Sequence, residues 1–144
     1  MQEFPHRYHA TAVARDEVVD VGSPGLEGLE TAPPAEFGGP GDKWSPETLL
    51  TAAIANCFIL TFKAVARASK LEWNAIECDV EAVLDRVDRV TLFTQAHLKV
   101  KLSIDDEDDS ERAKKLLEKS EANCLISNSL KTELHLDSEI LVTA

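Results

Sequence analysis

Three cysteines are the residues of this sequence best suited to covalent chemistry, and their surroundings differ. Cys78 falls on the apolar face of a segment with period-two alternation, which predicts a buried and inert thiol. Cys57 lies inside a long apolar segment, where simple packing would equally explain it. Cys124 follows an amphipathic segment and precedes residues 127–129 (SNS), which indicates a loop or short turn whose thiol can be reached.

A cysteine on a rigid helix together with a second one on a mobile connection suits peroxide reduction. The rigid thiol, here Cys57, would attack the peroxide and become a sulfenic acid. The mobile thiol, Cys124, would condense with it to give a disulfide. An odd number of cysteines favours a transient disulfide over a permanent disulfide framework.

Several short motifs resemble those of a known family, the OsmC/Ohr family of osmotically inducible and organic hydroperoxide resistance proteins. The matching stretches are residues 36–39 (EFGG), 45–50 (SPETLL), 53–58 (AIANCF) and 122–129 (ANCLISNS). Each motif is short, but their order and spacing agree with the family across nearly the whole chain. The sequence departs from the organic hydroperoxide branch at Leu125, where that branch usually has proline, so the branch stays open.

The resemblance implies a thiol-dependent peroxidase that forms an intertwined homodimer with active sites at the subunit interface. By this resemblance Cys57 is the peroxidatic cysteine, Cys124 the resolving cysteine, Glu47 the catalytic glutamate and Arg15 the arginine that steadies the thiolate. The implied substrate is an organic hydroperoxide, and the implied electron donor is a dithiol reductant such as a lipoylated protein. No cofactor is implied.

Arginine and glutamate suit this chemistry for physical reasons. A guanidinium such as that of Arg15 favours the thiolate over the thiol, and Glu47 would hold the guanidinium in place. The alternative is that both are ordinary charges, one on the surface and one at a helix start. Glu47 precedes Cys57 by ten residues, about 15 Å along a helix, so we expect a partner subunit or Arg15 to connect them.

The periodicity predicts an α+β fold with a mostly antiparallel sheet, a long buried central helix and one domain over residues 1–144. Ser45 is expected to cap the central helix, because Pro46 and Glu47 follow it as first-turn residues. The expected elements are strands at 8–14 and 18–21, a loop at 31–44, a helix at 45–71, a hairpin of strands at 76–85 and 90–104, a helix at 110–122, and a last strand at 134–142 with a break near Ser138.

The central helix is apolar on nearly every face between residues 49 and 62, so it needs a second layer of protein, for which a partner subunit is the expected source. Its Ile54, Phe58 and Phe62 would favour an alkyl or aryl hydroperoxide as bound substrate. The alternative is that these three side chains are plain core.

Composition excludes several classes of function. The net charge of -11 disfavours nucleic acid and anionic membranes as partners. The apolar segment at 49–62 is expected to be too short to span a membrane, and no signal peptide is visible, which predicts a cytoplasmic protein. The histidines lack metal-site spacing, so no metal site is expected. Two alternatives to the peroxidase are a dimeric module that binds an apolar or thiol-containing small molecule, and a structural stress protein.

Overall fold

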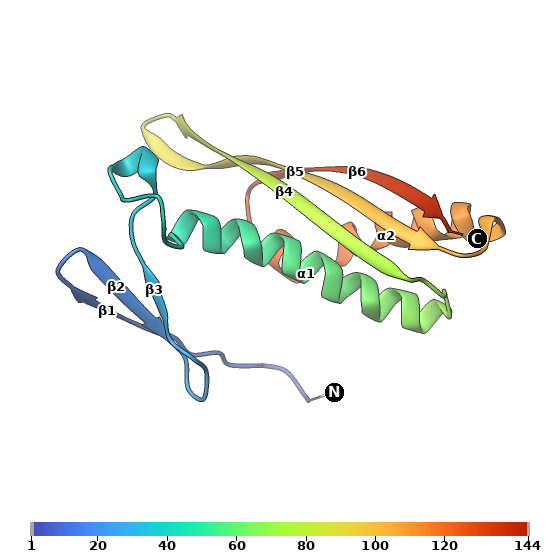
Figure 1. Ribbon diagram of the computed structural model, residues 1–144, viewed down its shortest axis with the longest axis horizontal. Helices are drawn as coiled ribbons and strands as arrows, with labels where there is room; N and C mark the ends of the chain where they lie inside the picture. Colours follow the sequence, from blue (N-terminus) through green and yellow to red (C-terminus); the bar gives the residue numbers. More distant parts are fainter. Residues whose placement is uncertain (1, 144) are drawn as a thin grey trace. The chain divides into compact units, whose positions relative to one another are not determined.

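The computed structural model describes residues 2–143, which form two compact units, Met1–Leu50 and Thr51–Ala144 (Figure 1). Met1 and Ala144 lie outside the described residues. Helix α1 (Pro46–Ser69) runs through the boundary between the units. The expectation of one domain over residues 1–144 therefore stays a prediction.

The N-terminal unit contains an antiparallel sheet of three strands, β1 (Thr11–Arg15), β2 (Val18–Gly22) and β3 (Leu29–Thr31). The first two strands pair as predicted, and the turn residue Asp16 has a φ of 57°. The predicted loop holds a short 3-10 helix, η1 (Ala35–Phe37), that the sequence did not indicate. Gly39 is required there, because an added Cβ would lie 1.7 Å from the backbone oxygen of Pro33.

The start of α1 confirms the predicted cap. The backbone amide of Thr48 donates to Ser45 Oγ at 3.1 Å, and the amide of Ser45 donates to Thr48 Oγ1 at 2.9 Å. This reciprocal pair satisfies two amides that would otherwise lack partners at a helix start, and Pro46 fits the first position because it has no amide to satisfy. The local sequence thus fixes where α1 begins.

The C-terminal unit contains a second three-stranded sheet, of β4 (Ala75–Val87), β5 (Val90–Ile104) and β6 (Glu133–Val142). The predicted hairpin of β4 and β5 is confirmed, and its turn places Asp88 and Arg89 at positive φ, as a tight two-residue turn requires. Strand β6 pairs parallel with β5 and runs without interruption, so the predicted break is wrong. Ser138 simply continues the ladder opposite Val100.

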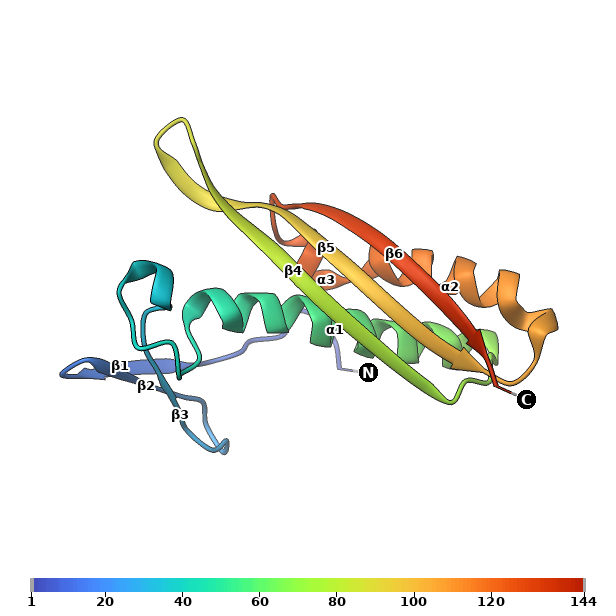
Figure 2. The same cartoon turned by 45° about the horizontal axis from the view of Figure 1, so that its top comes forward.

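A parallel pair of strands needs a crossover, which η2 (Glu107–Asp109), α2 (Ser110–Asn123) and α3 (Leu125–Asn128) provide. Figure 2 shows α1 and α2 on the same side of the β4–β5–β6 sheet. The α+β class and the predominance of antiparallel pairing are confirmed, but the strands form two sheets rather than one. The second sheet with these two helices positions the cysteines.

One stripe of each helix forms the core of the C-terminal unit. Residues four apart on α1 lie in the core with the inner face of β5 and a stripe of α2, in the spacing expected for buried helix faces. The buried members are Ile54, Phe58, Phe62, Ala66, Leu71, Ala96, Leu98, Val100, Leu102, Ile104, Ala113, Leu116 and Leu117. The other faces of α1 are not buried in the single chain, and Leu60 is 58% exposed.

Helix α1 also corrects the expectation that its apolar segment is too short to cross a membrane. By length and composition, its 24 residues would suffice to cross a membrane, and 22% of its most apolar 18-residue stretch is buried within the chain. The core helices of soluble proteins pass the same test. Four residues of α1, Ile54, Phe58, Phe62 and Ala66, lie in the core, which is the arrangement of a core helix with one covered stripe.

Candidate functional site

Cys57 lies in the middle of α1 and is partly exposed. It lines a groove of about 540 Å³ between α1 and the start of α3, referred to below as the Cys57 groove. Its lining residues are Ala53, Asn56, Cys57, Leu60, Thr61, Ala64, Leu125 and Ile126. The walls are mostly apolar, so the thiol is open to a small molecule with an apolar body.

Cys124 follows α2 as predicted, but a short helix, α3, comes directly after it in place of the expected loop. The expectation of a reachable thiol is wrong, because Cys124 is 1% exposed. The chain turns sharply here. The amide of Cys124 donates to the carbonyl of Glu121, and its carbonyl accepts from the amide of Asn128 at 2.9 Å. Ser127 Oγ donates to Cys124 Sγ at 3.4 Å in a buried contact. The tight turn directs the thiol inward.

The structure brings Cys57 and Cys124 together as free thiols. Burial raises the pKa of Cys57, but hydrogen bonds lower it by more, so this pKa lies below the usual value of a cysteine. The hydrogen bonds come from the backbone of Ile126, the Cys124 side chain, the Thr61 hydroxyl and the backbone of Leu125. The Sγ of Cys57 lies 3.8 Å from Thr61 Oγ1. Cys57 is therefore the sulfur that ionises more readily.

Cys124 has the opposite tendency. Burial raises its pKa, the neighbouring Cys57 raises it further, and hydrogen bonds from Ser127 only partly oppose this. On the inner face of β4, burial raises the pKa of Cys78 to about 12, with Asp79 and Cys124 adding to the effect. This agrees with the prediction that Cys78 is inert. The three thiols thus differ in ionisation, and only Cys57 is favoured as a thiolate.

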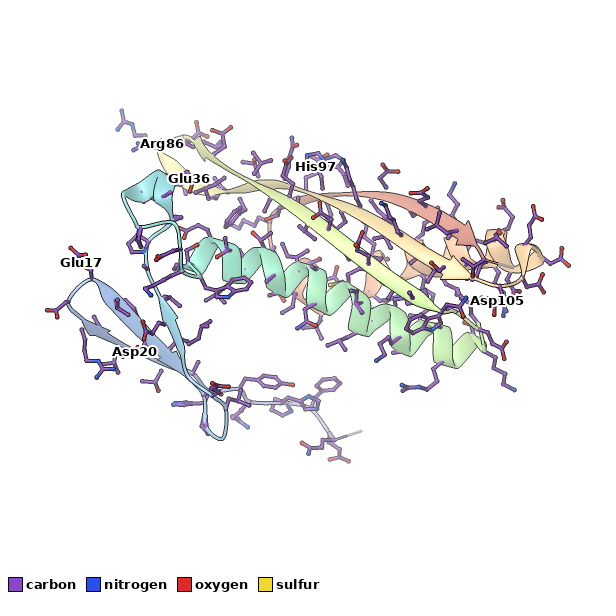
Figure 3. The ribbon with its side chains drawn as sticks, viewed as in Figure 1. Glu17, Asp20, Glu36, Arg86, His97 and Asp105 are labelled. Carbon is purple, nitrogen blue, oxygen red and sulfur yellow. The ribbon has the colours of Figure 1, made fainter. Side chains whose placement is uncertain are left out.

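Arg15 ends β1, with its side chain 75% exposed. It forms an ion pair with Asp20 of β2 (labelled in Figure 3), to which its Nε donates at 3.0 Å. The hydrogen bond and charge of Asp20, and to a lesser degree the charge of Glu30, raise the pKa of Arg15. Within this chain, the guanidinium predicted to steady the thiolate is held by a carboxylate of its own hairpin.

Glu47 lies in the first turn of α1 and is partly buried. It lines a second groove, of about 530 Å³, in the N-terminal unit, which we call the Glu47 groove. The other lining residues are Ala12, Val19, Val21, Thr31, Ala32, Pro33, Pro34, Phe37, Pro46 and Leu49. Sequence reasoning missed this groove, although the alternation of Val19 and Val21 and the prolines of the following loop could have indicated it.

Ile54, Phe58 and Phe62, expected to bind substrate, are instead core. All three are at most 1% exposed, and they lie in the core of the C-terminal unit with β5 and α2. They recur every four residues, so they share the one stripe of α1 that the sheet covers. The apolar residues beside Cys57 are Leu60, Leu125 and others of the Cys57 groove.

Among residues 2–143, no group of three or more metal-ligating side chains could hold a metal ion. The thiols of the C-terminal unit are the groups that its geometry prepares for covalent chemistry. A lowered pKa at an accessible cysteine with a second thiol hydrogen-bonded to it is suited to reversible oxidation through a disulfide.

Comparison with known proteins identifies the family. The profile of the OsmC-like protein family matches residues 39–139, well over half of the chain. The chain is 30% identical over 112 residues to YmaD of Bacillus subtilis (strain 168), covering 76% of this chain and 75% of that protein. It is 28% identical over 96 residues to the peroxiredoxin OsmC of Escherichia coli (strain K12), covering 67% and 66% of the two chains.

The fold agrees with that family. An organic hydroperoxide resistance protein from Elizabethkingia anophelis superposes with a TM-score of 0.79 at 19% identity, covering 99% of this chain and 100% of that one. Three observations point to the same family: the order of strands and helices, the pair of thiols, and these matches in sequence and structure. The chain belongs to the OsmC/Ohr family of OsmC-like proteins.

Proposed function

We propose that this protein is a thiol-dependent peroxidase that reduces organic hydroperoxides. One observation carries the proposal. Cys57 has a lowered pKa, lines an open groove, and is hydrogen-bonded to a second free thiol, Cys124. The thiolate is the nucleophilic form of cysteine, so Cys57 is the sulfur prepared to attack. Membership of a family of peroxiredoxin-like redox proteins supports the same reading.

The proposed reaction has two steps in the protein. The Cys57 thiolate attacks one peroxide oxygen, an S–O bond forms, the O–O bond breaks, and the alkoxide leaves as an alcohol after taking a proton. Cys124 then attacks the sulfur of the Cys57 sulfenic acid, the S–S bond forms, the S–O bond breaks, and water leaves. The two electrons come from the two thiols, and a dithiol reductant, for example the lipoyl group of a lipoylated protein, restores them.

The contrast between the two thiols supports this division of roles. The raised pKa of Cys124 keeps it protonated, so it does not compete for the peroxide. Its burial also shields it from direct oxidation. Because Cys124 is already hydrogen-bonded to Cys57, it needs no large movement to reach the sulfenic acid.

The walls of the Cys57 groove support an organic substrate. Leu60, Leu125 and Ile126 surround the thiol with apolar surface. An alkyl or aryl group would bury against this surface, which hydrogen peroxide cannot do. We therefore propose an organic hydroperoxide as substrate, and the cytoplasm as the location, where free thiols are kept reduced between turnovers.

Stopped-flow oxidation tests the proposal. The reduced protein is mixed with cumene hydroperoxide or with hydrogen peroxide, and peptide mapping then locates the disulfide. We expect faster oxidation by cumene hydroperoxide and a disulfide between Cys57 and Cys124. Slow and equal reaction of all three thiols would support a structural stress protein, and tight binding of cumene hydroperoxide without thiol loss would support a non-catalytic binding module.

The uncovered face of α1 supports a homodimer that completes the site. Leu60 is 58% exposed and Leu125 is 66% exposed beside the Cys57 groove, an apolar surface that a second copy would cover. Two α1 helices packed against each other would place Glu47 of one subunit near Cys57 of its partner. In the completed site, Arg15 would leave its ion pair with Asp20 and contact residues of that site instead.

Complementation between subunits is the expected consequence. Glu47→Ala and Cys57→Ser proteins should each be inactive, whereas an equimolar mixture after subunit exchange should recover up to about a quarter of the wild-type activity, because half the dimers are mixed and each has one intact site. The measurement is peroxide reduction before and after exchange. A monomer by light scattering at micromolar concentration, or no recovery after demonstrated exchange, would contradict the shared site.

Thr61 should tune the reactivity of Cys57. Its hydroxyl, 3.8 Å from Cys57 Sγ, helps to lower the pKa of that thiol. Thr61→Val removes the donor, so the pKa rises and a smaller fraction is thiolate at neutral pH. We expect the oxidation rate there to fall about two- to tenfold, the value of one hydrogen bond, and to recover at higher pH. Thr61→Ser keeps a hydroxyl and is the control. An unchanged pH profile in Thr61→Val would contradict the role.

A further inference from the structure

Two histidines far apart in the sequence stack on the outer face of the β4–β5–β6 sheet. His97 of β5 and His135 of β6 are register partners, and their ring centroids lie 4.8 Å apart with the planes inclined by 13°. Figure 3 shows His97 on the side of the sheet away from α1. His97 is partly exposed and His135 is exposed, so solvent reaches the pair.

The two imidazoles present the same nitrogen in the same direction. His97 Nε2 lies 3.1 Å from Gln95 Oε1, and His135 Nε2 lies 3.4 Å from Glu133 Oε1. Gln95 and Glu133 are themselves register partners one row away. Both Nε2 atoms are therefore directed toward the Gln95–Glu133 row of the sheet.

This arrangement matches the needs of a transition-metal ion. Neutral imidazole nitrogen is a preferred ligand of Zn²⁺, Cu²⁺ and Ni²⁺, at about 2.0–2.1 Å for zinc, so two such nitrogens on one ion lie at most about 4.2 Å apart. The ring centroids lie 4.8 Å apart, and because both rings are at the surface, rotation of the two side chains can turn both nitrogens toward one ion. The parallel strands hold the two Cα positions in register, so no backbone change is required.

The surrounding charge favours a cation. Glu133 lies beside His135, and Glu81 of β4 is the register partner of His97. Lys99, in the next row, is flanked in register by Asp79 and Asp137, which offset its charge. A negative local field raises the local concentration of cations, and the chain as a whole carries a net charge of -11.

We propose that His97 and His135 form a two-histidine site for a divalent transition-metal ion, with Cu²⁺ bound more tightly than Ni²⁺. Their Nε2 atoms coordinate the ion, and water fills the remaining positions, since no group of three or more metal-ligating side chains is found among residues 2–143. The site uses none of the residues of the proposed peroxidase chemistry.

Calorimetric titration of the reduced full-length protein with Ni²⁺ tests the proposal, because Cu²⁺ would oxidise the thiols. We expect one Ni²⁺ per chain and at least about a tenfold loss of affinity in either His97→Asn or His135→Asn, because either change leaves a single imidazole. A His6→Asn, His9→Asn double variant should bind as the wild type does. Circular dichroism establishes that each variant is folded.

Two results would overturn the site. The first is no Ni²⁺ binding by the wild-type protein. The second is equal binding by the wild type and a folded His97→Asn or His135→Asn variant, which would place the ion on the thiols or on other groups common to all of them. The experiment measures metal binding alone, so a negative result leaves the proposed peroxidase function untouched. Likewise, a lack of peroxidase activity would leave the metal site untouched.

Discussion

Cys57→Ser should abolish the reduction of organic hydroperoxides while leaving the fold intact. The serine hydroxyl is almost entirely protonated at neutral pH, whereas the pKa of the Cys57 thiol is lowered by four hydrogen-bonding groups around it. Loss of a nucleophile typically lowers the rate by on the order of 10⁴-fold or more, so turnover with cumene hydroperoxide should fall to background.

A matched control separates chemistry from packing. Cys78→Ala removes a partly buried thiol whose pKa is raised to about 12, and it should retain peroxidase activity with only a lower melting temperature. Circular dichroism and thermal melting of both variants check that each is folded. Near-native peroxidase activity in Cys57→Ser, or loss of activity in a folded Cys78→Ala protein, would end the assignment of Cys57 as the attacking sulfur.

Cys124→Ser should oxidise once and then stop. Cys57 keeps most of its environment, so the first peroxide still gives a sulfenic acid. Without the second thiol no internal disulfide forms, and the sulfenic acid reacts with more peroxide to give a sulfinic acid, which dithiols do not reduce. We expect a single turnover per subunit followed by irreversible inactivation, with mass spectrometry of the Cys57 peptide identifying the sulfinic acid.

The burial of Cys124 adds a sharper control. Ser127→Ala removes the hydroxyl that donates to Cys124 Sγ at 3.4 Å but leaves the thiol, so it should still form the disulfide and turn over repeatedly. Normal multiple turnover by Cys124→Ser with a dithiol reductant would show instead that an external thiol resolves Cys57, and that Cys124 is a packing residue.

Local patterns in the sequence were enough to predict most of the elements. The cap at Ser45, the hairpin turn between β4 and β5, and the stripe of α2 depend on interactions within a few residues, so the sequence predicts them well. The same holds for Cys78, whose place on an alternating strand already indicated an apolar environment. Motif order, spread over the chain, indicated the family.

Residues far apart in the chain came together only in the tertiary structure, because nothing in a local pattern says which distant segment covers a given face. The exposure of Cys124 was predicted wrongly, since its turn could point outward or inward and the packing of α2 and α3 directs it inward. From the sequence alone, Ile54, Phe58 and Phe62 could be either core or substrate-binding residues. The structure places them in the core, on the stripe of α1 that the sheet covers.

The parallel pairing of β6 with β5 is the clearest case. The crossover through α2 allows the parallel pairing, and this pairing makes neighbours of His97 and His135. The adjacency of Cys57 and Cys124 has the same origin, because α3 follows α2 back to the middle of α1. The sequence by itself determined which residues could do chemistry and on which elements they lie. Only the tertiary structure decided which of them meet, because long-range packing sets those distances.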